Sequence, residues 1–344
     1  MSKRLNVLFT KYHIQYTAYK RGFTIVELLV VIVVIGILAA ITIVSYTGIS
    51  GRAINSSVKS DISQAYKQLE ISKTTSSTDA YPVDLASSNL KSSNGTTYAY
   101  YSDSPYKSYC LVATNSTTVY SISGSNPTPI IGNCLSNGLV GYWALDNTTG
   151  MTDLSGNGNN GTANGGIAIG AAANHLGTAN KATSFDGVDD YVDVGKNQSL
   201  KITTGTIGAW VYPRTSSGFD GVFSYLHSYG SGYPGYGMGY RNGGLAFIIG
   251  DTTYREYAGQ GVIPVNQWRY MLVTLSQTTM GGYINGVNVV SIDKTISPTY
   301  NSNDSAQIGS FDITEAYLWD GLISDLRVYN RVFSQAEITA LYNL

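Results

Sequence analysis

The chain has 344 residues, enough for two folded domains of ordinary size. Only 12% of its residues are charged, about half of the roughly 25% usual for soluble domains, and its formal net charge is −1. Residues 1–22 hold five basic residues and no acid, so the remainder is acidic, with 16 basic and 22 acidic residues. This balance disfavours a protein that neutralises nucleic-acid phosphates, and two cysteines cannot form a zinc ribbon or a disulfide scaffold. We therefore expect no nucleic-acid partner.

A long apolar segment follows the basic residues. Residues 28–44 carry no charge, and extension back to Phe23 gives 22 residues, enough to cross a hydrocarbon core of about 30 Å. Apolar side chains occur on every face, unlike those of an amphipathic core helix. By the positive-inside rule, the preceding basic residues hold the N-terminus in the cytoplasm. The sequence predicts one membrane helix over residues 23–44 and places the chain after residue 50 outside the cytoplasm.

One carboxylate, that of Glu27, lies inside the predicted span. An acidic side chain there costs about 2.5–3.5 kcal/mol on insertion scales, so it needs a partner or a function. In an isolated span, the alternative is a glutamate near the helix end that reaches the membrane interface. However, the run Lys20-Arg21-Gly22-Phe23-Thr24-Ile25-Val26-Glu27 and the apolar stretch after it resemble the prepilin signature of type IV pilins and pseudopilins. The cleavage residue, the aromatic residue, the glutamate and the span all occur in register.

The resemblance implies specific processing and assembly. A prepilin peptidase would cut between Gly22 and Phe23, removing residues 1–22 as a leader, and Phe23 would be N-methylated. Glu27 would become the fifth mature residue and pair with a neighbouring subunit's terminal amine, so that other pilin subunits bundle with it. A secretory signal fits less well, because Ala39-Ala40 is a poor cleavage site, and no cysteine follows the apolar run as in a lipoprotein. We expect the cytoplasmic membrane before assembly and a surface pilus afterwards.

Residues 23–136 read as an α+β pilin-like module. Apolar residues at helical spacing predict that the membrane helix continues, amphipathic, to about residue 72. Residues 96–101, 109–114 and 118–123 then read as short antiparallel strands, and a long helix on a small sheet matches the pilin fold. An exported chain lies in an oxidising environment, so we expect a Cys110–Cys134 disulfide, with two free thiols as the alternative.

Residues 137–344 alternate between apolar and polar residues, as in an all-β two-sheet sandwich. Asn285-Gly286 predicts a hairpin and Asn242-Gly243 a weaker one, while Ser334 and Glu337 form a capping box ahead of a final helix. Seven segments follow in order: Gly138–Trp143, Asp153–Asn159, Ser184–Tyr191, Gly208–Trp210, Asn266–Trp268, Tyr283–Gly286 and Gly321–Arg331. They resemble a bacterial laminin-G-like, concanavalin-A-like jelly roll related to pentraxins. That resemblance implies a two-sheet jelly roll, a fold that hosts lectins, adhesion modules, spacers and some hydrolases.

No catalytic constellation is evident in this second module. Retaining glycosidases need two carboxyl groups about 5–5.5 Å apart, and the Glu-x-Asp-x-Glu pattern of the jelly-roll glucanases is missing from the sequence. The sequence also lacks a Gly-x-Ser-x-Gly nucleophile elbow. We therefore expect a protein that is not an enzyme.

Calcium is the better ligand hypothesis. Asp153 and Asn157 lie in a glycine-rich loop and Asp186 in a second acidic turn, and such oxygen ligands suit a hard cation. Similar domains often bind a structural calcium near the first loop and the last long strand, which brings in Asp325. The alternative is that aspartate, asparagine and glycine simply form turns.

A tyrosine-rich stretch, residues 225–240, is the most distinctive part of the module. An exposed tyrosine offers a rigid apolar face with a hydrogen-bonding tip, suited to stacking on sugars or proteins. We expect Tyr229 and Tyr233 to serve that purpose, and Tyr236 and Tyr240 to pack on a sheet.

The sequence therefore predicts a type IV pilus subunit that displays a lectin-like jelly roll for adhesion to glycans or surface proteins. An appendage of roughly 200 residues is bulky for the repeating subunit of a thin filament, which favours a minor or tip subunit. The alternatives are a pseudopilin of a secretion or DNA-uptake machine, a membrane-anchored glycan-active protein, and a static receptor that retains residues 1–22.

Overall fold

The structure is a computed structural model. It describes the following residues: 24–88, 90–102, 108–124, 126–216, 218–227, 233–251, 255–302, 304–311 and 317–344. The chain divides into two compact units, residues 1–54 and residues 55–344, and the second unit contains both the small sheet and the sandwich. Gly22, Phe23 and Tyr229 lie outside the described residues.

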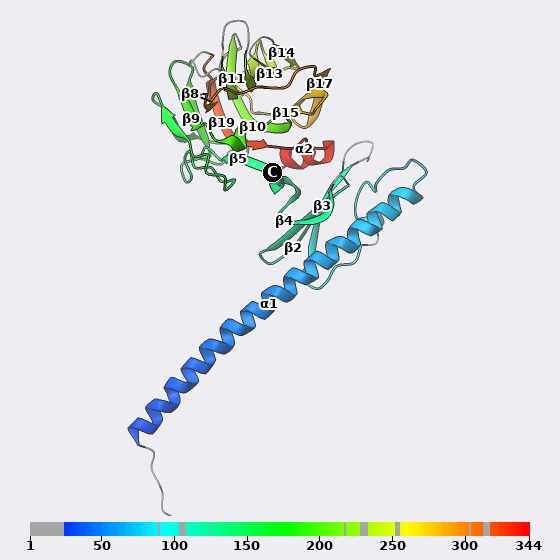
Figure 1. The fold of residues 1–344 in the computed structure, drawn as a ribbon, viewed down its shortest axis with the longest axis vertical. Helices are drawn as coiled ribbons and strands as arrows, with labels where there is room; N and C mark the ends of the chain where they lie inside the picture. The colour runs from blue at the N-terminus through cyan, green and yellow to red at the C-terminus, as the bar shows by residue number, and fades with distance from the viewer. Residues whose placement is uncertain are drawn as a thin grey trace, which may run out of the picture. The chain divides into compact units, whose positions relative to one another are not determined.

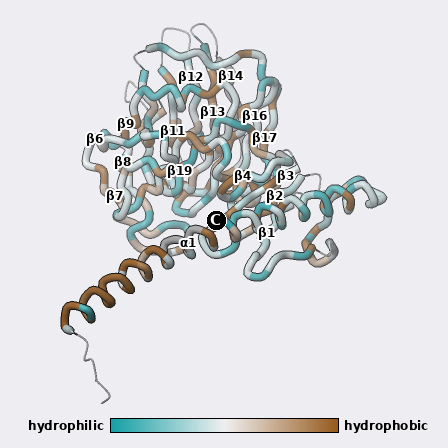
Figure 2. The backbone as a smooth tube through the Cα atoms, turned by 60° about the horizontal axis from the view of Figure 1, so that its bottom comes forward, coloured by the Kyte–Doolittle hydropathy of each residue, from teal (hydrophilic) through white to brown (hydrophobic). Residues whose placement is uncertain are grey.

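Helix α1 spans Ile25–Thr75. It begins with a capping box, in which Thr24 N donates to Glu27 Oε2 at 2.8 Å and Glu27 N donates to Thr24 Oγ1 at 3.2 Å. Over Ile25–Ile43 the helix is long enough to cross a membrane and is strongly apolar, as the brown colour in Figure 2 shows. Its side chains are exposed there. Within the second unit, by contrast, the apolar stripe that includes Val58 and Ile62 is fully buried. An apolar surface all round followed by a single buried stripe is the change of pattern that the sequence predicts.

The small sheet is antiparallel and lies along the second half of α1 (Figure 1). Its strands run in sequence order: β1 (Thr97–Ser102), β2 (Tyr109–Asn115), β3 (Thr118–Ser123) and β4 (Asn126–Ile131). The short helices η1 (Ala86–Ser88) and η2 (Cys134–Ser136) flank the sheet in the chain. Strand β4 was not expected, because Pro127 and Pro129 disfavour strands. Its edge position explains it, since a proline there interrupts no ladder in the middle of the sheet.

Two larger antiparallel sheets form the sandwich. The β10 sheet runs in the order β17 (Val287–Asp293), β16 (Thr279–Ile284), β15 (Arg269–Leu275), β10 (Gly205–Pro213), β19 (Asp320–Tyr329), β8 (Ala182–Asp186) and β7 (Ala168–Ala172), and β5 (Leu139–Trp143) also pairs with β19. The β12 sheet runs in the order β14 (Arg255–Gln260), β13 (Gly244–Gly250), β12 (Gly235–Arg241), β11 (Phe219–Leu226), β18 (Ala306–Ile308), β9 (Tyr191–Gly195) and β6 (Thr162–Asn164). The remaining helices are η3 (Gln198–Leu200) and α2 (Gln335–Tyr342). This architecture confirms the predicted sandwich.

Local sequence signals placed the turns and the last helix correctly. Both asparagine–glycine pairs have positive φ at both residues, 52° and 78° at Asn285-Gly286 and 48° and 86° at Asn242-Gly243. Such turns match the twist of the strands that they join. Ser334 caps α2, and its capping box with Glu337 is complete.

The core of the sandwich fills the space between the two sheets, and β12 shows how the sequence builds it. Tyr236 and Tyr240 alternate with glycines and are fully buried in that core, as expected for these two tyrosines. Gly237 and Gly239 lie between them, and a Cβ atom at either position would come within 3.1 Å of the Phe311 ring. The glycines therefore make room for Phe311 to cover the strand.

Candidate functional site

The N-terminal glutamate is held at the start of its own helix. Glu27 Oε2 accepts hydrogen bonds at 2.8 Å from both the backbone nitrogen and Oγ1 of Thr24. The predicted cut between Gly22 and Phe23 would free an amine at this same end of the helix. The proposed partner of that amine, a carboxylate, thus lies within one helical turn of the helix start.

Asp153 organises the loop that follows β5. This carboxylate is 7% exposed and accepts four hydrogen bonds, from Tyr142 N at 3.0 Å and from Ser155 N, Ser155 Oγ and Asn159 N at 2.9 Å each. Both carboxylate oxygens therefore bind groups of the protein. Asn157 is exposed on the same loop, where its amide donates to Leu139 O at 3.2 Å.

The acidic turn brings three carboxylates together. Oxygens of Asp186, Asp189 and Asp190 lie within 4.8 Å of one another, and among the described residues this is the one group of at least three histidine, cysteine, aspartate or glutamate side chains with metal-binding spacing. Burial raises the pKa of Asp190, the hydrogen bond from Asp186 N opposes this shift, and the negative charge of the Asp186 carboxylate adds to it. Asp153 and Asp325 are not part of the group. Calcium binding by Asp153, Asn157, Asp186 and Asp325 stays a prediction.

The tyrosine-rich stretch presents less surface than the sequence suggested in the part that the structure describes. Tyr233 is half-buried and packs against Leu226, Ile248 and Phe311. Tyr229 lies outside the described residues, so its role in ligand binding stays a prediction.

The outer face of the β10 sheet carries a row of aromatic side chains, those of Trp210 and Tyr270, which we call the aromatic row. In register, Trp210 on β10 pairs with Tyr270 on β15 and with Ser324 on β19. The imidazole of His175, from the turn between β7 and β8, lies flat on the Trp210 indole, with ring centroids 3.7 Å apart and an interplanar angle of 6°. Burial lowers the pKa of His175, and the nearby Asp325 carboxylate opposes this shift.

A second row runs beside the first and is polar. Arg327 on β19 pairs with Gly208 on β10 and with Tyr142 on β5, and its guanidinium lies 4.3 Å from the Tyr142 ring centroid. Asp325 accepts from Tyr142 Oη at 3.0 Å and from Arg327 Nη2 at 3.4 Å. Asp325 has a φ of 52° where the pairing of β19 with β10 shifts register, and this bulge turns its side chain out of the regular alternation.

Gly208 lies in the polar row, and its lack of a side chain lets Tyr270 of the aromatic row reach across to it. A Cβ atom there would lie 2.4 Å from Tyr270 Oη, so the phenol crosses β10 where no side chain blocks it. Burial raises the pKa of Tyr270 well above its usual value. Sequence alternation alone could have placed Trp210 on an outer face. The positions of His175 and Asp325 depend on a turn and a bulge that the pattern does not reveal.

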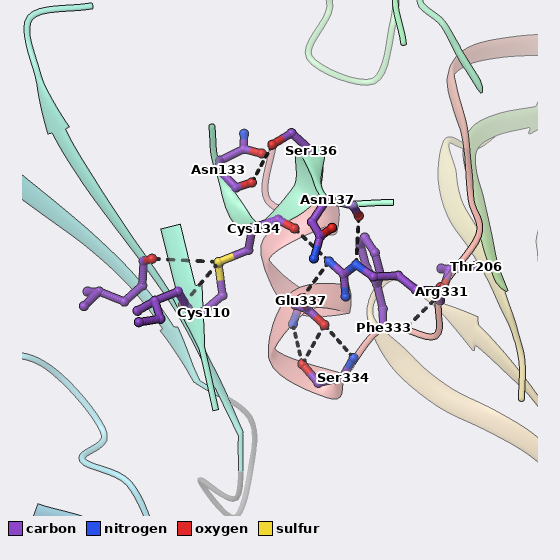
Figure 3. A network of polar contacts seen from close by, with 12 residues as sticks. Cys110, Asn133, Cys134, Ser136, Asn137, Thr206, Arg331, Phe333, Ser334 and Glu337 are labelled. Carbon is purple, nitrogen blue, oxygen red and sulfur yellow. Dashed lines mark hydrogen bonds and ion pairs between the residues drawn. A yellow bond between two sulfur atoms is a disulfide. The ribbon is translucent and has the colours of Figure 1, made fainter. Parts of the chain in front are cut away.

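Another polar cluster, centred on Arg331, joins the small sheet to the sandwich, and Figure 3 shows it. Arg331 follows β19 and donates to Cys134 O at 2.7 Å and to Asn137 O at 2.8 Å. Its guanidinium also pairs at 2.8 Å with Glu337, which is 2% exposed. Leu135 packs into the same apolar cluster as Trp210, Tyr270 and Phe333. The sandwich is therefore fastened to the small sheet within one compact unit.

The predicted disulfide is formed and anchors this junction. Cys110 on β2 is bonded to Cys134, whose carbonyl accepts from Arg331. Replacing both cysteines with serine should lower the free energy of unfolding by about 3 kcal/mol, because the bond closes a loop with a sequence separation of 24. Urea unfolding of the full chain in detergent measures this. A reductant should shift the wild-type midpoint as far and leave the variant unchanged, and equal midpoints without reductant would contradict the prediction.

Comparison with protein families identifies both ends of the chain. Residues 17–43 match the prokaryotic N-terminal methylation motif. Residues 186–339 match the concanavalin A-like lectin/glucanases superfamily. No curated protein matches the chain. The chain thus carries a prepilin-type N-terminus and a concanavalin A-like sandwich, as both sequence resemblances indicated.

Solved structures resemble the sandwich at low identity. Domain 4 of AbnA, a GH43 extracellular arabinanase from Geobacillus stearothermophilus, solved with arabinotriose, is 19% identical over 59% of this chain and 98% of its own, with a TM-score of 0.45. The binding domain of Paraclostridial Mosquitocidal Protein 1 is 18% identical over 61% of this chain and 52% of its own, with a TM-score of 0.49. The botulinum neurotoxin serotype G binding domain is 13% identical over 59% of this chain and 50% of its own, with a TM-score of 0.48. The chain spans about half the length of these two toxin domains, and scores below 0.5 carry no functional argument.

Proposed function

We propose that this protein is a minor or tip subunit of a type IV pilus, and that it displays its sandwich for adhesion to glycans or surface proteins. The observation that carries the proposal is the methylation motif at residues 17–43, which includes the exposed apolar part of α1 at Ile25–Ile43. An apolar helix surface of this kind needs either lipid or other helices around it. In the proposal, the membrane surrounds it before assembly and other pilin subunits surround it afterwards.

The proposed mechanism starts with a subunit held in the cytoplasmic membrane by α1. Prepilin peptidase removes residues 1–22 together with their five basic residues, and Phe23 becomes the methylated terminus. The Glu27 carboxylate then pairs with the terminal amine of a neighbouring subunit. Desolvating this pair is favourable only when both partners are present, so it links extraction from the membrane to bundling of the helices.

The sandwich would serve in binding, not catalysis. The contacts of Arg331 and Leu135 hold it to the small sheet, so a ligand that it binds would be attached firmly to the rest of residues 55–344. Its bulk favours a minor or tip position over the repeating position, because each subunit in the body of a thin filament is surrounded by others. A calcium ion would be structural in this proposal.

Mass spectrometry of the protein's N-terminus tests the proposal. Chains from sheared surface filaments should begin at methylated Phe23, whereas a Gly22→Asp variant should keep residues 1–22 and stay in the membrane fraction. An intact Met1 or Ser2 terminus found only in membranes would contradict the proposal and leave an anchored binding protein. Loss of secretion or DNA uptake on gene deletion, with adhesion unchanged, would indicate a pseudopilin.

A further inference from the structure

The turn that carries His175 covers an aromatic surface beside the polar row of Asp325 and Arg327. We propose that this turn is a displaceable cover, and that a saccharide ring stacks on Trp210 when the cover lifts. The inference rests on the proposed adhesive function and assigns its glycan to one position on the outer face of the β10 sheet. Three features of the described residues support it: the geometry of the stack, the weak attachment of the turn and the polar groups beside the indole.

The stack has the geometry of an occupied sugar platform. The indole of Trp210 is fixed by Tyr270 and Tyr342, whose ring centroids lie 5.3 and 5.6 Å from it. His175 lies parallel to it at 3.7 Å, which is van der Waals contact for two flat rings, and Trp210 is 8% exposed in its presence. A saccharide ring stacks its C–H face on an aromatic ring through similar contacts. The imidazole therefore occupies the position that the sugar would take.

The turn is shaped by hydrogen bonds within itself. Asn174 Oδ1 accepts from Leu176 N at 3.2 Å and from Thr178 N at 3.0 Å, and Gly177 N donates to Asn174 O at 2.9 Å. These bonds do not involve the β10 sheet, so they can persist when the turn moves. Leu176 beside His175 is 67% exposed and adds little packing. Displacement of the turn tip mainly breaks the stack on Trp210.

The closed position also has a cost. His175 Nδ1 is buried and has no hydrogen-bond partner among the described residues. A buried polar atom without a partner opposes the state that buries it, because it loses its hydrogen bonds to water. Lifting the turn restores these bonds. The stack and the lost hydration thus act in opposite directions, which keeps the closed and open positions close in free energy.

Polar groups that suit sugar hydroxyls lie beside the covered indole. Ser324, paired with Trp210 in register, is fully buried, and its Oγ finds no hydrogen-bond partner in the described part of the chain. Asp325 follows it, with its side chain 26% exposed, and pairs with Arg327, whose side chain is 13% exposed. A carboxylate and a guanidinium together can accept and donate at adjacent hydroxyls. An aromatic face flanked by such groups is suited to recognise a saccharide.

The test uses two substitutions of His175 with opposite expected effects. His175→Ala removes the cover and should tighten saccharide binding between about twofold and tenfold, because the competent open state becomes dominant. His175→Phe keeps a flat ring on Trp210 without the unpartnered nitrogen, so it should weaken binding by a similar factor. Leu176→Ser changes the exposed neighbour and should leave affinity unchanged.

The measurement is ¹⁹F NMR of the full chain in detergent, labelled with 5-fluorotryptophan. Glucose, galactose, N-acetylglucosamine and N-acetylneuraminic acid are the probes, and a Trp210→Phe variant assigns the Trp210 resonance. Titration should shift this resonance. The affinity should be highest for His175→Ala, intermediate for the wild type and lowest for His175→Phe. Binding that leaves the Trp210 resonance unshifted and has the same affinity in the wild type, His175→Ala and His175→Phe would overturn this subsite, but not the adhesive function. No binding of any probe, even to His175→Ala, would overturn the subsite and leave pilus assembly to be judged by the N-terminal analysis.

Discussion

Replacing Arg331 with alanine should lower the free energy of unfolding by about 3–5 kcal/mol, because it leaves a buried carboxylate without its counter-charge. Glu337 is 2% exposed and pairs with Arg331 at 2.8 Å. The same substitution removes the donors to the carbonyls of Cys134 and Asn137. The loss of stability should therefore exceed that for removal of an ordinary surface charge. It should weaken both the contacts to Cys134 and Asn137 and the ion pair with Glu337.

Chemical unfolding of the full chain in detergent, followed by tryptophan fluorescence, measures this loss. Lys196→Ala is the matched control, because it removes the same charge from an exposed residue of the sandwich, where a change is expected to stay within about 0.5 kcal/mol. Arg331→Lys should fall in between, since an ammonium keeps the charge but cannot reproduce the planar fork of donors. Equal stability of Arg331→Ala and Lys196→Ala would show that the junction contributes little.

Replacing Asp153 with alanine should lower the free energy of unfolding by about 4 kcal/mol, from loss of a buried acceptor that serves several donors. The backbone nitrogens of Tyr142, Ser155 and Asn159 all donate to this carboxylate. Without it, these nitrogens lose their acceptor, and Asn159, which is 1% exposed, has little access to water as a replacement. Urea unfolding of the full chain gives the size of the effect.

Asp186→Ala is the matched control and also tests the calcium hypothesis. Asp186 is exposed, and among the described residues its carboxylate accepts from its own turn, from Val188 N at 2.8 Å and Asp189 N at 3.4 Å. Its removal should therefore cost under about 1 kcal/mol in the presence of a chelator. Bound calcium would stabilise the native state and enlarge the Asp186→Ala effect in calcium buffer. An Asp153→Ala effect that vanishes in a chelator would show that Asp153 acts through a metal ion and not through its hydrogen bonds.

Local patterns predicted much of the fold because they act over a few residues. The change in the apolar pattern along α1, the two asparagine–glycine hairpins and the capping box of Ser334 each reflect backbone or helix geometry within one turn. Strand β4 was missed because its prolines disfavour strands in general, and only its place at the edge of the small sheet allows them.

The candidate site was harder to predict because its parts lie far apart in the sequence. The sequence suggested Tyr233 as a stacking residue; it is half-buried against the cluster that includes Leu226 and Phe311, and its role in ligand binding stays a prediction. Conversely, no local signal pairs His175, in the turn between β7 and β8, with Trp210 on β10. The bulge at Asp325 also interrupts the alternation on which strand predictions rest.

The sequence by itself determined the prepilin-type N-terminus, the apolar helix and the two-sheet fold, because side-chain periodicity and short motifs encode them directly. Only the tertiary structure decided which polar groups meet. Arg331 reaches Cys134 across a separation of 197 residues, and Tyr142 reaches Asp325 across 183. Such contacts depend on strand order and register, which many sequences with the same alternation could satisfy differently.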